Sequence, residues 1–167
     1  MENEILLKTN YKTKIELIKS TLENDIRIRK KIHHNYFIFY KRLNTIIKTI
    51  INTLNATSIC SLILNYNKIG NNIALIIALS TTSISSIISV INTTIETDNK
   101  FHQHKISDLE YSNLYREITA RILRNGLTSE DLDFILLEIN DKISLIEDNS
   151  PPIILKKIKS LSNIVID

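Results

Sequence analysis

The chain has 167 residues, a formal charge of only +3 and no arginine-rich run with interleaved aromatic residues, which excludes nucleic acid as the expected partner. Two glycines and two prolines give few turn signals for a β fold. Length and composition therefore predict an all-α chain that forms one domain, or one hairpin with appendages. The single cysteine, Cys60, excludes an internal disulfide.

Residues 1–43 are predicted to form an amphipathic, basic N-terminal helix. Apolar residues recur there every three or four positions, which is the spacing of one face of an α-helix. This stripe consists of Ile15, Ile18, Leu22, Ile26, Ile32, Tyr36, Phe39 and Leu43. Neither proline nor glycine interrupts the sequence as it runs into Thr49, so we expect one continuous helix from near Asn10 to Asn65.

Residues 44–66 and 73–95 are predicted to be two membrane spans joined by a turn at residues 67–72. The stretches Thr49–Asn67 and Ile69–Ile95 contain no charged residue, although charges are common on either side. A helix needs ~20 residues to cross ~30 Å of hydrocarbon, a length that the second stretch exceeds and the first nearly reaches. Basic residues flank the outer ends of this pair, so the positive-inside rule places both termini in the cytoplasm.

Each hydrophobic stretch has an isoleucine side and a polar side, a pattern that fits two opposite arrangements. In a soluble bundle the isoleucines would face inward and the polar atoms would face water. In a membrane hairpin the isoleucines would face lipid, and the polar groups would face a partner helix or a wet lumen. Length and the charge gap favour the membrane hairpin. The candidate pore-lining or interhelical polar residues are Lys48, Asn52, Asn55, Ser85, Ser89 and Asn92.

The C-terminal part predicts two further segments. Residues 96–126 are expected to continue the second long helix outside the membrane, with a glycine at position 126 as its stop signal. Residues 127–167 are expected to form an acidic helix and then a short basic helix. Thr128 and Asp131 make a capping box at the start of the acidic helix. Its acidic face either packs against the basic first helix or stays in water.

Folding the two long helices back on each other at Lys68–Ile69 predicts which residues lie level. Opposite charges then meet repeatedly, although each surface pair contributes only ~0–1 kcal/mol. The predicted ion pairs are Lys41 with Glu96, Arg29 with Asp108, and Arg27 with Glu110. The same register brings all four histidines into one layer: His33, His34, His102 and His104. Neighbouring histidines point apart on a helix, so we expect separate histidines and no metal site.

Charged and aromatic blocks flank the hydrophobic pair. Residues 29–36 and 40–44 precede it, and His104–Ile118 follows it. The most specific block includes His104, Leu109, Tyr111, Leu114, Tyr115 and Arg116. Over about residues 27–152 the chain resembles the SLATT-type two-transmembrane proteins, particularly versions from large nucleocytoplasmic DNA viruses.

The resemblance implies a two-pass membrane protein. It implies a membrane-perturbing effector, as thought for bacterial relatives in defence systems, or a virion or inner-membrane component. Members often carry proline and glycine in the first span, where this chain has Ile50 and Ile51. Close approach of the two spans would then depend on the small residues Ala56, Ser58 and Ser61.

The sequence predicts no enzyme, cofactor or catalytic residue, because the glycines are isolated and Cys60 has no nearby histidine. It predicts a protein whose partners are the lipid bilayer and further copies of itself, and which permeabilises or perturbs that bilayer. The alternative is a viral structural or scaffolding protein, either membrane-associated or a soluble helical bundle. In that case it would belong to a virion or host membrane and would contact other virion or membrane proteins.

Overall fold

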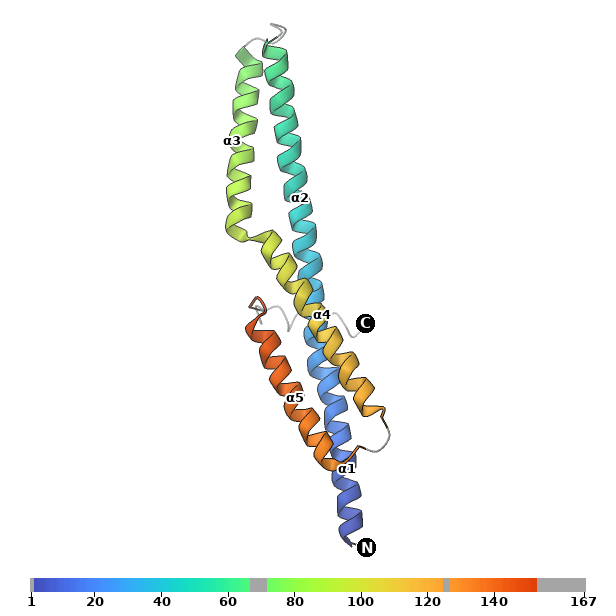
Figure 1. Ribbon diagram of the computed structural model, residues 1–167. Helices are drawn as coiled ribbons and strands as arrows, with labels where there is room; N and C mark the ends of the chain where they lie inside the picture. Colours follow the sequence, from blue (N-terminus) through green and yellow to red (C-terminus); the bar gives the residue numbers. More distant parts are fainter. Residues whose placement is uncertain (1, 67–71, 125–126, 153–167) are drawn as a thin grey trace. The chain divides into compact units, whose positions relative to one another are not determined.

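The computed structural model describes residues 2–66, 72–124 and 127–152, which confirm the all-α prediction. Two long antiparallel helices pack as a hairpin, and a C-terminal helix follows them (Figure 1). The elements in chain order are α1 (Glu2–Thr21), η1 (Leu22–Ile26), α2 (Arg27–Tyr66), α3 (Asn72–Ile95), α4 (Thr97–Ile122) and α5 (Ser129–Asp148). The chain divides into unit 1, residues 1–37 and 102–167, and unit 2, residues 38–101. The predicted short basic helix lies outside the described residues.

The first long helix is continuous up to Tyr66, as predicted, but it begins at Glu2 and not near Asn10. It contains one irregularity, the five-residue π-helix η1, whose residues Leu22 and Ile26 are both buried. A π-turn inserts extra backbone into an α-helix and so changes which side chains face the same direction. Beyond this π-helix Ile32 of the predicted stripe is still buried, whereas Phe39 is exposed.

The second long helix is interrupted at Glu96, which joins α3 to α4 with a φ angle of 55°. This left-handed conformation is unfavourable for a residue with a Cβ atom, by about 1–2 kcal/mol. Local hydrogen bonds offset that cost: the Glu96 amide donates to the carbonyl of Asn92 at 3.1 Å, and the Thr97 hydroxyl donates to Asn92 Oδ1 at 2.5 Å. No glycine marks this joint, so it is not predictable from the glycine and proline positions.

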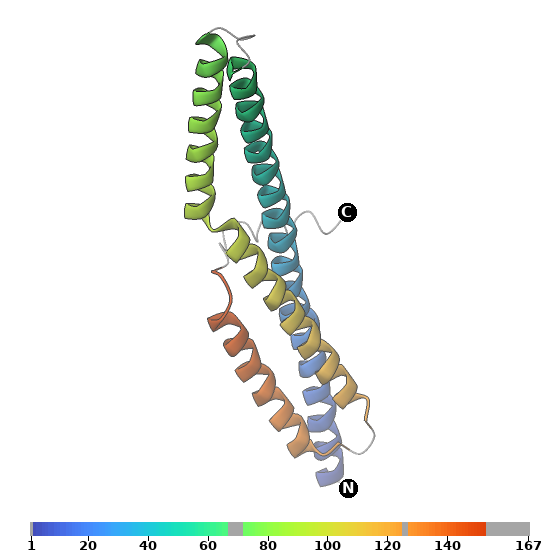
Figure 2. The same ribbon diagram turned by 45° about the horizontal axis from the view of Figure 1, so that its top comes forward.

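Unit 1 has a three-helix core formed by α1 with η1, α4 and α5 (Figure 2). Each helix contributes apolar residues spaced three or four apart, so that one face of each is buried. The core residues are Ile18, Leu22, Ile26, Tyr111, Leu114, Ile118, Leu132, Ile135, Ile139 and Ile146. The predicted apolar stripe of the first helix therefore faces inward in this unit at Ile18, Leu22 and Ile26.

Two acidic residues of α5, Asp133 and Glu147, pair with basic residues of the first long helix, whereas Glu130, Asp141 and Asp148 stay exposed, so each of the two predicted alternatives holds for part of this face. Lys14 Nζ lies 2.6 Å from Asp133 Oδ2 and 2.8 Å from Ser129 Oγ. Arg29 pairs with Glu147 at the other end of α5. These contacts are partly exposed, so they set the orientation of α5 more than they stabilise the unit.

An ion-pair network that the sequence analysis missed joins α4 to α5. Lys142 Nζ lies 2.8 Å from Glu117 Oε2 and 2.9 Å from Glu138 Oε1. Arg121 pairs with the same two carboxylates. The hydrogen bond from Lys142 is the main cause that lowers the pKa of Glu138. In the sequence, the i, i+4 spacing of Glu117 with Arg121 and of Glu138 with Lys142 indicates the ion pairs within each helix, but not those between the helices.

Helix α5 begins with the predicted capping box. The Asp131 amide donates to Thr128 Oγ1 at 3.2 Å, and the Thr128 amide donates to Asp131 Oδ2 at 2.7 Å. We expect Thr128→Ala to lower the free energy of unfolding of unit 1 by about 1 kcal/mol, because the Asp131 amide loses its acceptor, Thr128 Oγ1. Chemical denaturation followed by circular dichroism measures this. Thr128→Ser keeps the hydroxyl and should behave like the wild type; equal losses in both variants would contradict the capping role.

Candidate functional site

The facing surfaces of α2 and α3 in unit 2 are lined by small residues. Figures 1 and 2 show α3 alongside the C-terminal half of α2. The buried residues of this contact are Ser58, Ser61, Ala74, Ala78 and Ser85. Small side chains allow two helix backbones to approach closely. Of the three residues expected to permit this approach, Ser58 and Ser61 are confirmed, whereas Ala56 is exposed because it lies on another side of α2.

The large apolar side chains of the hairpin are exposed. They lie on both helices and along their whole length, from Ile46 to Leu64 and from Ile73 to Ile95. The isoleucines and valine more than half exposed are Ile46, Ile59, Ile63, Ile73, Ile76, Ile87 and Val90. This is the reverse of a water-soluble bundle, in which such residues form the core.

Hydrogen bonds cross the hairpin between its small polar residues. Ser58 Oγ donates to the carbonyl oxygen of Ala78 at 3.1 Å and lies 2.7 Å from Thr82 Oγ1. Ser85 Oγ donates to Asn55 Oδ1 at 2.8 Å. The predicted register placed Asn55 level with Thr82, three positions from its observed partner, so it is correct to within one helical turn.

The six candidate pore or interhelical residues do not form one cluster. Asn55 and Ser85 bond to each other across the hairpin. Lys48 pairs with Asp98 at 2.9 Å, and Asn92 accepts from Thr97 next to the Glu96 joint. Asn52 and Ser89 are exposed, and their side chains make no hydrogen bond within residues 2–66, 72–124 and 127–152. These last two polar groups are therefore available to a partner outside this chain.

The predicted ion pairs of Arg27 and Arg29 are replaced by nearer carboxylates. Arg27 lies 2.6 Å from Glu23, one turn earlier on the same continuous helix, and not beside Glu110. Arg29 pairs with Glu147 of α5, and the carboxylate of Asp108 lies 3.0 Å from His34 Nδ1. The predicted register covers only the two long helices, so Glu147 of α5 was not among the expected partners. The pairing of Lys41 with Glu96 stays a prediction.

The block that carries the SLATT resemblance lies on α4. Three of its residues, His104, Tyr111 and Leu114, are buried in unit 1. The Tyr115 hydroxyl donates to Glu23 Oε1 at 2.9 Å, which raises the pKa of this tyrosine. Leu109 and Arg116 are exposed. Most of this block therefore serves the packing of α4 against the first long helix.

Two of the four histidines, His33 and His104, contact each other. His33 Nδ1 and His104 Nδ1 are 3.0 Å apart, and both residues are buried. His34 and His102 are exposed. Among the residues that the structure describes, no three metal-binding side chains come together.

Two helices are long and apolar enough to cross a membrane, judged by length and composition. They run from Asn10 to Tyr66 and from Asn72 to Ile122. In their most apolar windows only 11% and 17% of the residues are buried, whereas the core helix of a soluble protein would be mostly buried. The fold and this hairpin define a helical protein with two candidate membrane spans. The sequence matches no protein-family model, and no curated protein or solved structure is significantly similar to it.

Proposed function

We propose that this chain is a two-pass membrane protein whose hairpin, formed by α3 and the second half of α2, associates with further copies of itself. The observation that carries the proposal is the reversed polarity of unit 2. Small and hydroxyl-bearing residues such as Ser58 and Ser85 are buried, while large residues such as Ile59 and Ile76 are exposed. In water this exposed apolar surface would be unstable, whereas in hydrocarbon it is the expected surface.

Self-association follows from the polar groups that the hairpin leaves exposed. Asn52 and Ser89 lie within the two predicted spans and are exposed. In a bilayer no water satisfies such groups, so they need partners from another helix or from a wet lumen. A second copy presents the same amide and hydroxyl and can satisfy them reciprocally. An assembly of this kind supports the finer role, that of an effector that permeabilises or perturbs a membrane.

The SLATT resemblance supports the same role from the sequence side. It rests on the block from His104 to Ile118 and suggests either a membrane-perturbing effector or a viral membrane component. The positive-inside rule adds an orientation with both termini in the cytoplasm. Under this proposal unit 1 lies outside the membrane and contributes the folded, charged part of the chain.

Carbonate extraction tests the membrane part of the proposal. The full chain, expressed with its membranes, should stay in the pellet after alkaline extraction, because its apolar surface is held in hydrocarbon. A soluble bundle or a scaffolding protein bound to the membrane surface would be released. Recovery of a dispersed, helical protein from plain buffer without detergent would overturn the proposal.

Asn52→Leu tests the self-association. We expect the dissociation constant of the detergent-solubilised assembly to rise roughly 3- to 30-fold, because one interhelical amide bond in a membrane contributes about 0.6–2 kcal/mol. Sedimentation in detergent measures the mass of the assembly. Thr53→Val is the matched control, because the Thr53 hydroxyl already donates to the carbonyl of Thr49 in its own helix at 2.9 Å. An unchanged mass for Asn52→Leu would remove this residue from the interface.

Leakage from loaded vesicles tests the permeabilising role separately. If the polar side of the hairpin lines a wet path, the double variant Asn52→Leu, Asn55→Leu should lose the leakage of the wild type, because both amides are replaced by apolar groups. Unchanged leakage in this variant would count against a pore lined by these residues. A wild type that resists extraction but releases no vesicle contents would support a scaffolding role.

A further inference from the structure

A pair of buried histidines connects the two long helices within unit 1. His33 of α2 is fully buried and His104 of α4 is 2% exposed. Their Nδ1 atoms are 3.0 Å apart, and their ring centroids are 5.2 Å apart. Tyr36 stacks on His104 with ring centroids 5.0 Å apart, and Tyr111 lies against His33 at 5.6 Å. The two imidazoles therefore have an aromatic surround with little access to water.

The hydrogen bond between the two Nδ1 atoms needs one hydrogen, carried by one of the two rings. One Nδ1 must carry the hydrogen and the other must accept it, so the bond is lost when both Nδ1 atoms carry a hydrogen. The remaining nitrogen of His33, Nε2, is buried and has no hydrogen-bond partner within the described residues. A further proton on His33 would place a positive charge where no acceptor receives it.

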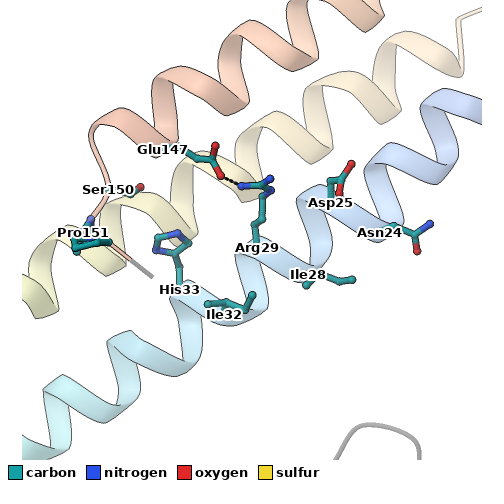
Figure 3. A pocket seen from close by; sticks show the side chains of 10 residues that line it. Asn24, Asp25, Ile28, Arg29, Ile32, His33, Glu147, Ser150 and Pro151 are labelled. Carbon is teal, nitrogen blue, oxygen red and sulfur yellow. Dashed lines mark ion pairs between the residues drawn. The ribbon is translucent and has the colours of Figure 1, made fainter. Parts of the chain in front are cut away.

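The charged and titratable groups around His33 come from three helices and from η1. Arg29 and Tyr36 lie on α2, Asp108 and Tyr111 lie on α4, Glu147 lies on α5, and Asp25 of η1 lines the same groove. Figure 3 shows His33 and Arg29 in the wall of a groove of about 390 Å³ that Glu147, Ser150 and Pro151 also line.

Two of the carboxylates have other partners. Glu147 pairs with Arg29, and Oδ2 of Asp108 lies 3.0 Å from His34 Nδ1, whereas Oδ1 of Asp108 is buried with no hydrogen-bond partner among the described residues. Burial raises the pKa of the Tyr111 phenol, so this group stays neutral. None of these groups therefore hydrogen-bonds to the second nitrogen of His33.

We infer that the His33–His104 pair is an acid-sensitive latch, which holds α2 against α4 while both rings are neutral and opens when His33 takes up a proton. Burial supports this, because it lowers the pKa of His33 from 6.5 to about 4, against the opposing effect of Asp108 and with a smaller contribution from Arg29. The latch goes beyond the proposed membrane role and does not depend on it, since both histidines lie in unit 1.

The sign and size of the effect follow from linkage. Because the pKa of His33 is lowered in the folded state, the open state binds more protons as the pH falls below 6.5. The stabilisation that comes from keeping His33 neutral is fully present above pH 6.5 and is lost as the pH falls toward about 4. With these two values the equilibrium constant for opening rises ~30-fold between about pH 7.5 and about pH 5.

Hydrogen exchange of the full chain in detergent measures this opening. At about pH 5, peptides covering residues 27–37 and 102–118 should lose roughly 30-fold in protection relative to about pH 7.5, after correction for intrinsic exchange. His33→Asn keeps a hydrogen-bonding group near the Nδ1 position and cannot titrate, so it should lose this response. His102→Gln, at an exposed position of α4, should keep it. Equal protection at both pH values in the wild type, or an undiminished response in His33→Asn, would overturn the latch.

A second measurement covers the case in which His33→Asn does not fold. Nitrogen-15 spectra of the wild-type imidazoles report the tautomer and the charge of each ring directly. We expect His33 to remain neutral at about pH 5 in the closed molecule, with one protonated and one unprotonated Nδ1 across the pair. A charged His33 ring together with full exchange protection would contradict the proposal.

Discussion

Ala78→Leu should open the hairpin of unit 2. Ala78 is only 2% exposed, and its carbonyl oxygen accepts the hydrogen bond from Ser58 at 3.1 Å. A leucine adds three carbon atoms at a point where the two helices approach closely, so α3 must move away from α2. Overpacking of this kind costs about 1–3 kcal/mol. The hydrogen bond from Ser58 would be lost as well, which adds about 0.5–1.5 kcal/mol.

The measurement for Ala78→Leu is energy transfer between one dye on α2 and one on α3 as SDS is titrated into detergent micelles. The variant should lose transfer at a lower SDS fraction than the wild type. Leu79→Ala is the matched control, because Leu79 is the next residue on α3 and is 60% exposed. Similar shifts for both variants would mean that the contact between the small residues does not hold the hairpin together.

Local rules predicted the helices of this chain well. The absence of proline and glycine up to Tyr66 predicted the first long helix, and the Thr128–Asp131 spacing predicted the start of α5. Both features act over a few residues, so neighbouring sequence is sufficient to recognise them. The hairpin register was correct to within one turn because the length of the turn region limits how far two antiparallel helices can slide.

Which side of each helix is buried was harder to predict from the sequence. The stripes of unit 1 and unit 2 have the same isoleucine-rich spacing, yet the isoleucines face inward in one and outward in the other. Periodicity measures how residues divide between two sides of a helix and does not say which side is covered. The small residues Ser58, Ser61 and Ala78 on the covered side provide the missing signal.

The joint at Glu96 and the partner of Arg29 were also not predicted from sequence patterns. The left-handed joint at Glu96 has no glycine, because side-chain and backbone hydrogen bonds around Asn92 stabilise it instead. The partner of Arg29 was missed because Glu147 is far away in the sequence. The Arg29–Glu147 pair exists only after the helices have packed, so propensity alone could not reveal it, whereas the joint at Glu96 depends on local hydrogen bonds that no glycine or proline signals.

Ile118→Ala should destabilise unit 1 by about 2–5 kcal/mol, the range for removing a fully buried isoleucine from a packed core. Ile118 is 0% exposed and belongs to the cluster that joins α4 to α1 and α5. A small helical unit has a total stability of about 5–15 kcal/mol, so this loss is a large share of the whole. Urea denaturation followed by circular dichroism measures it. Leu123→Ala, at a position that is 76% exposed, should change stability by no more than about 0.5 kcal/mol.

Ile118→Ala also tests whether membrane attachment through unit 2 depends on the packing of unit 1. The side chains proposed to face lipid, such as Ile59 and Ile76, all belong to unit 2, whereas Ile118 belongs to unit 1. Ile118→Ala should therefore lose stability and still resist carbonate extraction as the wild type does, because its apolar hairpin surface is unchanged. If extraction instead released Ile118→Ala in parallel with its loss of stability, membrane attachment would depend on the packing of unit 1. The exposed isoleucines of unit 2 would then be insufficient to hold the chain in a bilayer.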